Sequence, residues 1–379
     1  MSSKSQQPER PDNLTRRELV RDGAAAAAGL AVGMAATGCQ KEQRAETPKA
    51  VSAVRKTRSY NPEMEYRPLG KTGLWVSAVC MGGHWKRIEK MVPNAVKGDN
   101  WLGANIDDEG FKKNRRDVVT RCSEAGINYI DACTREEVIT YAEALRGRRD
   151  SMYLGFSFYQ FEMRNREFRT ADALLGTLDK GLKEARLEYV DLWRITMNEQ
   201  SGTHKESEVD EMMKALEKAR QQGKCRLTGF SSHDRPHIKS MIEKYPDIVQ
   251  VVVTPYTAKS KVKPEDSLFD AVKQHGVGVF GIKPFSSNAL FKGDGSLESP
   301  TAEEDSRIAR MAIRYILATD VITAPIPGMI NAHQVDNMVK AVKEPELNEA
   351  EAKELQEAMD HAWARLPENY QWLKNWEYV

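Results

Sequence analysis

Residues 126–158 begin Gly-Ile-Asn-Tyr-Ile-Asp-Ala-Cys, continue in a helical pattern as far as Gly147, and end Ser-Met-Tyr-Leu-Gly-Phe-Ser-Phe. The order is strand, helix, strand, and Asp131 stands where the first strand ends. In β/α folds this edge of the sheet carries the chemistry. Two interpretations of Asp131 stay open on this stretch alone: a functional carboxylate, or the cap of the helix that follows.

The same alternation extends in both directions along the chain. Strands are expected at 75–81, 127–131, 152–156, 188–195, 225–231, 248–253, 277–283 and 321–326. Helices are expected near 110–124, 137–146, 170–186, 207–222, 235–244, 265–274, 304–318 and 332–342.

Each expected strand is an almost continuous apolar run, which indicates a parallel sheet covered on both faces. No Gly-x-Gly-x-x-Gly follows any strand, so the pattern favours an α/β fold of the (β/α)8 TIM barrel type over a doubly wound sheet. An open α/β sheet is the alternative. Strands around Lys71-Thr72-Gly73 predict an N-terminal β-hairpin. The residues after 342, which end in an aromatic run over 369–378, predict a C-terminal helical and aromatic extension.

Composition excludes some classes of protein. The chain has 379 residues, 40% of them hydrophobic, with 56 basic and 55 acidic side chains. This balance argues against a nucleic-acid surface, which needs a basic excess. No CxxC pair occurs, so no metal site is expected. Buried thiols are expected for four of the five cysteines: Cys80, Cys122, Cys133 and Cys225.

The first sixty residues predict targeting and a tether. Arg16-Arg17 precedes a short apolar run from Ala24 to Ala36, which indicates a twin-arginine export signal over 1–39 and a protein of the periplasm or cell envelope. The small residues before Cys39 also suit a lipoprotein cleavage site, so contact with the membrane is expected only through a lipid on Cys39; cleavage without a lipid is the alternative. Residues 40–60 are expected as a linker and 61–379 as the barrel.

Six motifs in barrel order resemble the aldo/keto reductase family. They are Arg67-Pro-Leu-Gly-Lys-Thr-Gly-Leu-Trp-Val-Ser, Gly126-Ile-Asn-Tyr-Ile-Asp, Glu188-Tyr-Val-Asp-Leu, Gly229-Phe-Ser-Ser-His-Asp, Val277-Gly-Val-Phe-Gly-Ile-Lys-Pro and Ile326-Pro-Gly. The resemblance implies hydride transfer between NADPH and a carbonyl. In that family a tyrosine gives the proton, an aspartate-steadied lysine assists it, and a histidine orients the carbonyl.

Of these four positions only Asp131 matches. Glu136 stands where the resemblance implies the tyrosine, Ser157 where it implies the lysine, and Thr196 where it implies the histidine. Serine and threonine are too weakly acidic to replace a lysine-assisted phenol, so a non-standard acid is required. Glu136, if buried, and His84, just after the first strand, are the candidates.

Three other residues are interpreted by strand alternation. Arg194 lies two residues before Thr196 on the same strand, so it shares the inward face. We expect its guanidinium to pair with Asp131 or Glu136, because a buried unpaired charge is costly; the alternative is that it turns outward to solvent. Tyr129 and Tyr141 are expected in the core.

The resemblance also implies cofactor-binding residues. Ser231, Ser232 and Gln250 match positions that hold the nicotinamide amide, and Lys283, Pro284 and Phe285 match the segment beside that ring. Gly328, Asn331 and Gln334 match the loop and helix start that take the adenosine phosphate. Gln334 stands where a basic residue is usual, so NADP and NAD both stay open.

Two functions from different classes follow. One is an exported aldo/keto reductase-like oxidoreductase that binds NAD(P) and acts on a small carbonyl, alcohol or sugar with a non-standard acid. The other is a catalytically degenerate barrel that serves as a binding or envelope protein.

Overall fold

A computed structural model describes residues 48–97, 103–260, 268–344 and 346–376. The export signal, Cys39 and the first part of the expected linker lie outside these ranges. Seven parallel strands form one sheet in the order β3-β4-β5-β6-β7-β8-β9. Their bounds are β3 (Tyr129–Ala132), β4 (Tyr153–Phe156), β5 (Val190–Thr196), β6 (Cys225–Ser231), β7 (Val251–Pro255), β8 (Gly278–Ile282) and β9 (Ala324–Pro325).

Residues 80–82 join the two edges of this sheet. Met81 forms a parallel bridge with Ile130 beside β3, and Gly82 forms one with Gly328 after β9. These residues therefore take the eighth strand position, and the expected barrel is confirmed. The expected first strand at 75–81 was wrong in part: β2 (Trp75–Ser77) pairs antiparallel with β1 (Tyr66–Pro68) in the hairpin, and only the residues after it reach the barrel.

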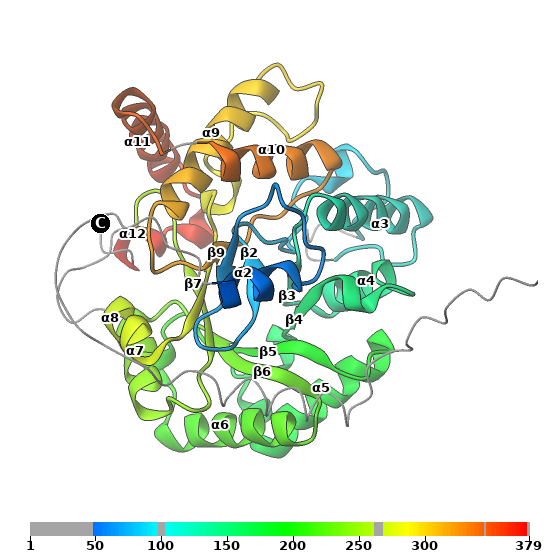
Figure 1. The fold of residues 1–379 in the computed structure, drawn as a ribbon, viewed down its shortest axis with the longest axis vertical. Coiled ribbons are helices and arrows are strands. Elements are labelled where there is room, and N and C mark those ends of the chain that lie inside the picture. Colours follow the sequence, from blue (N-terminus) through cyan, green and yellow to red (C-terminus); the bar gives the residue numbers. More distant parts are fainter. Residues whose placement is uncertain (1–47, 98–102, 261–267, 345, 377–379) are drawn as a thin grey trace, which may run out of the picture.

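Helices surround the sheet (Figure 1). Those of the barrel are α3 (Glu109–Glu124), α4 (Arg135–Ala144), α5 (Ala171–Ala185), α6 (Glu206–Gln221), α7 (Arg235–Lys244), α8 (Leu268–His275), α9 (Ala302–Leu317) and α10 (Ala332–Lys343). Each lies within a few residues of its expected position, because the apolar stripe that faces the sheet has a helical period. In the described residues, no helix has the length and apolar content needed to cross a bilayer.

The end of the expected linker is part of the fold. Helix α2 (Pro48–Arg55) precedes Arg58, whose guanidinium lies 3.0 Å from the buried Asp191 at the start of β5. Arg149 and Arg226 bind the same carboxylate at 2.6 and 3.3 Å. Burial would raise the pKa of Asp191, but the three guanidinium groups hold it well below its usual range. Residues 48–60 were therefore wrongly expected as a tether.

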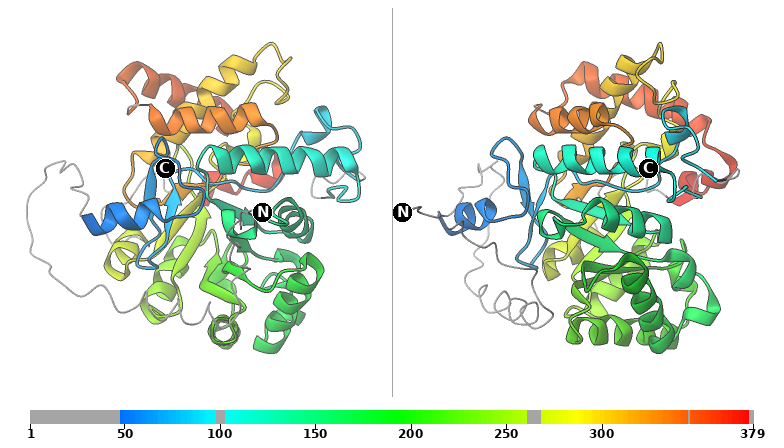
Figure 2. Two further views of the ribbon diagram at one scale, coloured as in Figure 1. Left: turned by 45° about the vertical axis from the view of Figure 1, so that its right-hand side comes forward. Right: turned by 90° about the vertical axis from the view of Figure 1, so that its right-hand side faces the viewer.

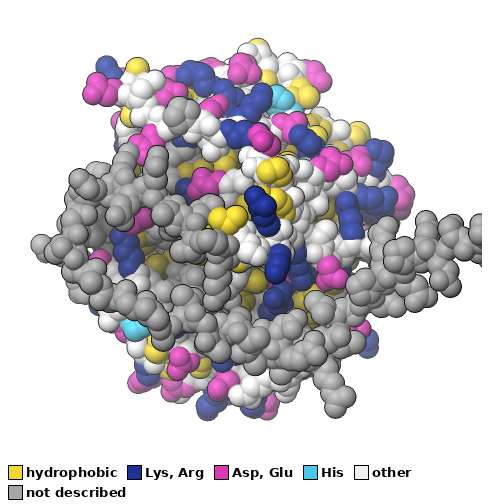
Figure 3. Space-filling view, viewed as in Figure 1, with side chains coloured by type: hydrophobic (Ala, Val, Ile, Leu, Met, Phe, Trp, Pro, Cys, Tyr) yellow, Lys and Arg dark blue, Asp and Glu magenta, His cyan; other side chains and the backbone are white. Residues whose placement is uncertain are grey.

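The two ends of the barrel are covered differently. Lys71 N in the hairpin donates to Gly276 O, just before β8, so the hairpin covers the N-terminal ends of the strands. The C-terminal extension, α11 (Glu349–Ala364), a turn at Glu368–Tyr370 and α12 (Leu373–Trp376), follows α10. Figure 2 shows the blue hairpin and the red C-terminal segment at opposite ends. On the face drawn in Figure 3, basic and acidic side chains are interspersed, as the balanced composition predicts.

Candidate functional site

A cavity of about 420 Å³ opens at the C-terminal ends of the strands. Its walls come from the strand ends and from the loops that follow them, and the C-terminal segment adds Tyr370 and Trp372. This is the end of a β/α barrel at which active sites are built. Of the residues expected at the site, the following line the cavity: His84, Asp131, Arg194, Thr196, Ser231, Lys283, Pro284, Phe285, Gly328, Asn331 and Gln334.

Arg194 and Asp131 form a buried, two-pronged ion pair on the cavity floor. Arg194 Nε donates to Asp131 Oδ1 at 2.9 Å and its NH2 group donates to Oδ2. The two side chains are 4% and 6% exposed. Burial would lower the pKa of Arg194, but the adjacent carboxylate raises it well above its usual value. The predicted pairing with Asp131 is confirmed, and the partner is Asp131 rather than Glu136.

A glycine makes room for this pair. Gly155 on β4 pairs in register with Asp131 on β3. A Cβ atom there would lie 2.9 Å from Asp131 Oδ1 and 2.1 Å from Tyr129 Oη. The missing side chain therefore lets the Tyr129 hydroxyl approach Asp131, to which it donates at 3.2 Å.

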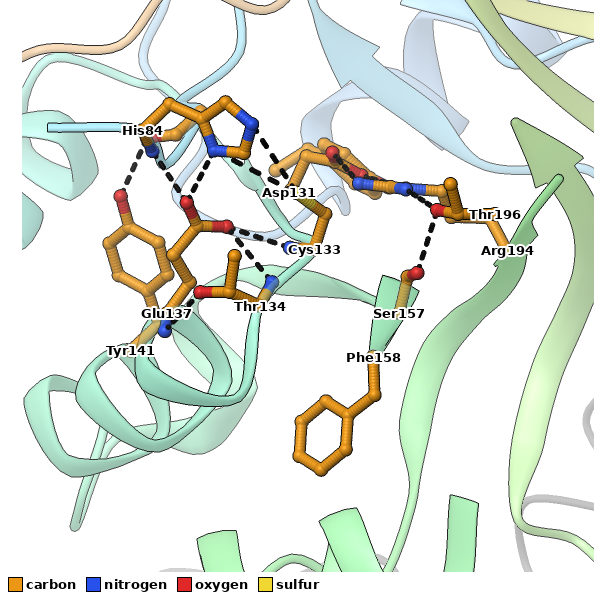
Figure 4. Close-up of polar contacts among 12 residues, drawn as sticks. His84, Asp131, Cys133, Thr134, Glu137, Tyr141, Ser157, Phe158, Arg194 and Thr196 are labelled. Carbon is orange, nitrogen blue, oxygen red and sulfur yellow. Dashed lines mark hydrogen bonds and ion pairs between the residues drawn. The ribbon is translucent and has the colours of Figure 1, made fainter. Parts of the chain in front are cut away.

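Ser157 and Thr196 belong to a buried network beside the pair. Their hydroxyl oxygens are 2.8 Å apart, and Ser157 also donates to Glu162 Oε2 at 2.5 Å. Glu162, which sequence reasoning missed, accepts from Thr196 N at 2.7 Å. Burial raises the pKa of Glu162 against the effect of these hydrogen bonds. Figure 4 shows Ser157 joined to Arg194 through Thr196. Ser157 thus faces Glu162 and does not line the cavity.

The carboxylate that lines the other side of the cavity belongs to Glu137 rather than to Glu136. Glu136 turns toward Arg135 at 3.6 Å and is not among the cavity-lining residues. Neighbouring helix residues point about 100° apart, so the next residue faces inward. The Thr134-x-x-Glu137 spacing is a capping box, which the structure contains; this signal could have identified Glu137 in the sequence.

His84, Glu137 and Cys133 meet at the start of α4 (Figure 4). His84 Nδ1 lies 2.6 Å from Glu137 Oε1, and Cys133 Sγ lies 3.6 Å from His84 Nε2. Burial would raise the pKa of Glu137, but His84 and backbone N–H groups lower it to about 2. Desolvation would lower the pKa of His84, but Cys133 and Glu137 raise it well above its usual value. Cys133 is partly exposed, contrary to the expected buried thiol; Cys80, Cys122 and Cys225 are buried.

The three residues expected to hold the nicotinamide amide, Ser231, Ser232 and Gln250, do not lie together in the structure. Ser231 lines the cavity, whereas Ser232 Oγ lies 2.6 Å from Ser201 Oγ and does not. Gln250 precedes β7 and accepts from Thr228 N at 3.2 Å, so it lies at the opposite end of the strand from the cavity. The assignment of Gln250 to the cofactor site was therefore wrong: the strand was expected at 248–253 but runs from Val251 to Pro255, so Gln250 stands before its first residue.

The start of α10 forms another wall. Asn331 caps this helix by accepting from Gln334 N at 2.8 Å, and Gln334 Oε1 accepts from Ile330 N at 2.9 Å. A Cβ atom on Gly328 would lie 2.7 Å from Gly83 O. Gly328 thus permits close approach of two backbone segments beside the cavity.

Tyr370 was missed as a site residue. Lys86 Nζ lies 4.8 Å and Lys283 Nζ 5.4 Å from the centre of its ring. Burial would raise the pKa of this phenol, but Lys283 and Lys86 lower it to about 8. The aromatic C-terminal run was visible in the sequence, but nothing there showed that it reaches the cavity.

Trp372 and the two interior tyrosines have structural roles. Trp372 stacks on His233, with ring centres 4.5 Å apart. Tyr141 is buried and donates to Gly82 O at 2.6 Å, and Tyr129 stacks on Phe280 with centres 4.3 Å apart. The expectation that both tyrosines lie in the core is confirmed.

Comparison with known proteins identifies relatives along most of the chain. A sequence model of the Aldo/keto reductase family matches residues 105–360. L-galactose dehydrogenase of Arabidopsis thaliana is 23% identical, over 75% of this chain and 90% of that protein. L-glyceraldehyde 3-phosphate reductase of Escherichia coli K12 is 21% identical, over 74% and 90%. The holo form of aldo-keto reductase AKR11C1 from Bacillus halodurans aligns with a TM-score of 0.55 and 22% identity, over 81% of this chain and 99% of that chain.

Proposed function

Because this chain belongs to the aldo/keto reductase family, we propose that it binds NAD(P) in the cavity and exchanges a hydride with a small carbonyl or alcohol substrate. One observation carries the proposal. A single cavity is lined both by the Asp131–Arg194 floor at the strand ends and by the loops after β8 and β9. Substrate and cofactor segments thus face the same space.

The residues present fit a dinucleotide. Lys86 and Lys283 place positive charge on one wall, and the N-terminus of α10 presents backbone N–H groups on another. Both features suit phosphate oxygens. Lys283 and Phe285 would flank the nicotinamide end, and Gln334 the adenosine end. When bound, the nicotinamide supplies or accepts the hydride.

Proton transfer needs a group other than the floor residues. Arg194 stays charged at working pH and cannot serve as the acid. Tyr370 lies in the cavity, and its pKa of about 8 keeps the phenol protonated at neutral pH while weakening its O–H bond. We assign the proton donor of carbonyl reduction to Tyr370. Lys86 and Lys283 stabilise the phenolate that remains.

The substrate class is proposed from the relatives. One is named for L-galactose and another for L-glyceraldehyde 3-phosphate. The first is a sugar and the second a sugar phosphate with a free aldehyde. The polar floor offers Thr196 and Ser231 hydroxyls to such a molecule. We therefore place sugars and sugar-derived carbonyls first among the substrates to be tried.

The degenerate barrel remains the second candidate function. The observation that favours it is the Arg194–Asp131 pair: Asp131, which the resemblance implies would steady a catalytic lysine, is bound instead by an arginine that cannot donate a proton. In that case the cavity binds a small molecule without hydride transfer.

NADPH binding separates the two functions. Titration with NADPH, followed by cofactor fluorescence, is expected to show saturable binding that Lys283→Gln weakens. Lys273→Gln is the matched control, because Lys273 pairs with Asp320 on the surface. If neither NADPH nor NADH binds, the oxidoreductase proposal fails.

The assignment of Tyr370 has its own test. Reduction of glyceraldehyde by NADPH is expected to decline above about pH 8, as the phenol of pKa about 8 loses its proton. Tyr370→Phe should lower kcat by roughly 10²-fold or more and remove that decline. Tyr159→Phe is the comparison, since Tyr159 is the other tyrosine among the cavity-lining residues described. Loss of the decline in the Tyr159 variant alone would move the acid to that residue.

A further inference from the structure

One group of reactive side chains in the cavity has no part in the hydride chemistry above. His84 comes from the loop after residues 80–82, Cys133 from the loop after β3, and Glu137 from the first turn of α4. Cys133 Sγ lies 3.6 Å from Nε2 and 3.7 Å from Nδ1 of His84. All three residues line the cavity. Figure 4 shows their side chains pointing toward one another.

We propose that Cys133 is a nucleophilic thiol, deprotonated by His84, that adds reversibly to the carbonyl carbon of an aldehyde bound in the cavity. The choice of an aldehyde as the electrophile rests on the proposed function. The activation of the thiol rests only on the geometry of Cys133, His84 and Glu137.

Glu137 orients the imidazole. Its Oε1 accepts from His84 N at 2.5 Å and lies 2.6 Å from His84 Nδ1, which places the imidazole proton on Nδ1. Nε2 is then the nitrogen that takes the thiol proton. A base held by a buried acid beside a nucleophile is the general arrangement of an activated cysteine.

The same three groups lie close enough to hold a metal ion, with ligand atoms within 4.8 Å of one another. The carboxylate argues against this use. Glu137 Oε2 accepts from Cys133 N at 2.7 Å and from Thr134 N at 3.3 Å, while Oε1 accepts from His84. Both oxygens are therefore committed to the protein, so Glu137 positions His84 and leaves the thiol as the reactive group.

The charges around the Cys133 thiol are compatible with a thiolate beside a protonated His84. Arg194, on β5, is neutralised by Asp131. Tyr159, on the loop after β4, has its pKa raised by burial and by the neighbouring Cys133, so it stays neutral. Tyr370, from the C-terminal segment, faces His84. Lys86, two residues after His84, and Lys283, after β8, lie over the Tyr370 ring. Of these groups, His84 is the one in contact with the Cys133 thiol, so it is the group that takes the thiol proton.

The addition balances without a further reactant. The Cys133 thiolate forms an S–C bond to the carbonyl carbon, the π bond of C=O breaks, and the electron pair moves to oxygen. The proton that His84 took from the thiol passes to that oxygen. The product is a thiohemiacetal, and the reverse steps release the aldehyde unchanged.

Alkylation with iodoacetamide, followed residue by residue by mass spectrometry, tests the activated thiol. In the native protein Cys133 is expected to react at a rate that changes less than about threefold between pH 6 and pH 8, because His84 takes the thiol proton in the proposed arrangement. In His84→Gln the rate should rise roughly tenfold per pH unit, as for an ordinary thiol. The buried Cys80, Cys122 and Cys225 serve as internal controls and should stay unmodified.

His84→Gln is the decisive variant, because Glu137→Gln disturbs a helix cap and is expected to unfold more easily. Thermal unfolding of the His84 variant checks that it is folded. A native rate that also rises tenfold per pH unit overturns the proposal. So does reactivity that appears only after EDTA treatment, which would identify the group as a metal site.

Protection experiments test the covalent step. Glyceraldehyde should slow alkylation of Cys133, whereas glycerol, which lacks the carbonyl, should not. Carbon-13 NMR of aldehyde-labelled glyceraldehyde should show a thiohemiacetal signal that Cys133→Ser abolishes and Cys225→Ser keeps. If the signal is absent, or persists in Cys133→Ser, covalent capture is wrong.

These readouts are independent of NADPH titration. Binding of NADPH with an unactivated Cys133 leaves the proposed function standing and refutes this inference. Aldehyde capture without NADPH binding supports the inference and refutes the oxidoreductase proposal.

Discussion

At the scale of single residues, the Arg194–Asp131 pair defines the cavity floor. Both side chains are almost fully buried, and removal of one leaves the other charge without its partner. Breaking such a pair costs about 3–5 kcal/mol, whereas replacing both members by apolar residues costs much less. The pair therefore constrains substitution at both positions at once.

We expect Arg194→Met to lower the free energy of unfolding by about 3–5 kcal/mol. The double variant Arg194→Met with Asp131→Leu should lose less than the sum of the two single changes. Urea denaturation of the four proteins measures this coupling. Arg164→Met is the matched control, because Arg164 pairs with Glu199 near the surface and such pairs contribute about 0–1 kcal/mol. Additive losses at Arg194 and Asp131 would show that the pair is not coupled.

The lowered pKa of Glu137 predicts that the folded protein loses stability in acid. This pKa is lowered from 4.5 to about 2 in the folded protein. Because the unfolded chain binds the proton more readily, this stabilisation is present above pH 4.5 and is lost as the pH falls toward 2. Between pH 5 and pH 3 the loss is about 2 kcal/mol.

Urea denaturation at pH 5 and pH 3 measures that difference. Glu137→Gln should lack its share of the loss, although it is less stable throughout. Glu136→Gln, one residue away and turned from the cavity, should keep the full dependence. Equal pH dependence in the wild type and in Glu137→Gln would contradict the prediction.

At the scale of elements, the C-terminal segment completes the cavity wall. It brings Tyr370 and Trp372 to a cavity built otherwise from barrel loops. Trp372 stacks on His233, whose pKa lies well below its usual value mainly because of burial, with Lys283 and Arg164 contributing. The segment thus covers one face of the His233 ring, whose burial favours the neutral form.

We expect Trp372→Ala to raise the pKa of His233 toward that of an exposed histidine, because removal of the indole admits water. NMR titration of the histidine ring protons measures the change. His237, which is on α7 and whose pKa is also lowered by burial, should titrate as before and serves as the control. An unchanged titration of His233 would show that the barrel alone desolvates it.

At the scale of the whole molecule, we propose from the N-terminal pair Arg16-Arg17 that the protein is exported by the twin-arginine route. We expect replacement of Arg16 and Arg17 by lysine to keep the protein inside the cytoplasm, because twin-arginine export depends on both side chains. Fractionation of expressing cells with an antibody measures this. Arg21→Lys is the control, because Arg21 lies outside the pair. Normal export of the double-lysine protein would remove the proposal.

The barrel could be predicted from the sequence because its signals are local. Alternation of apolar strands with helical stripes placed the helices of the barrel within a few residues. Strand alternation also placed Arg194 on the face of Thr196, and the cost of a buried charge then predicted that it pairs with Asp131 or Glu136. The period of the apolar residues and the cost of burying an unpaired charge were enough for these conclusions.

The sequence by itself therefore determined the fold and the inward direction of Arg194, since each depends on spacing within one element. It left Asp131 and Glu136 open as partners of Arg194. The fold decided between them, because it places β3 and β5 on either side of β4. Tertiary structure alone decided the rest of the site. It brought His84, Cys133 and Glu137 together from three elements, placed Tyr370 beside Lys86 and Lys283, and put Gln250 at the far end of its strand. These contacts join residues up to hundreds of positions apart in the sequence. The local pattern of apolar residues does not indicate which loops meet at the end of a closed barrel.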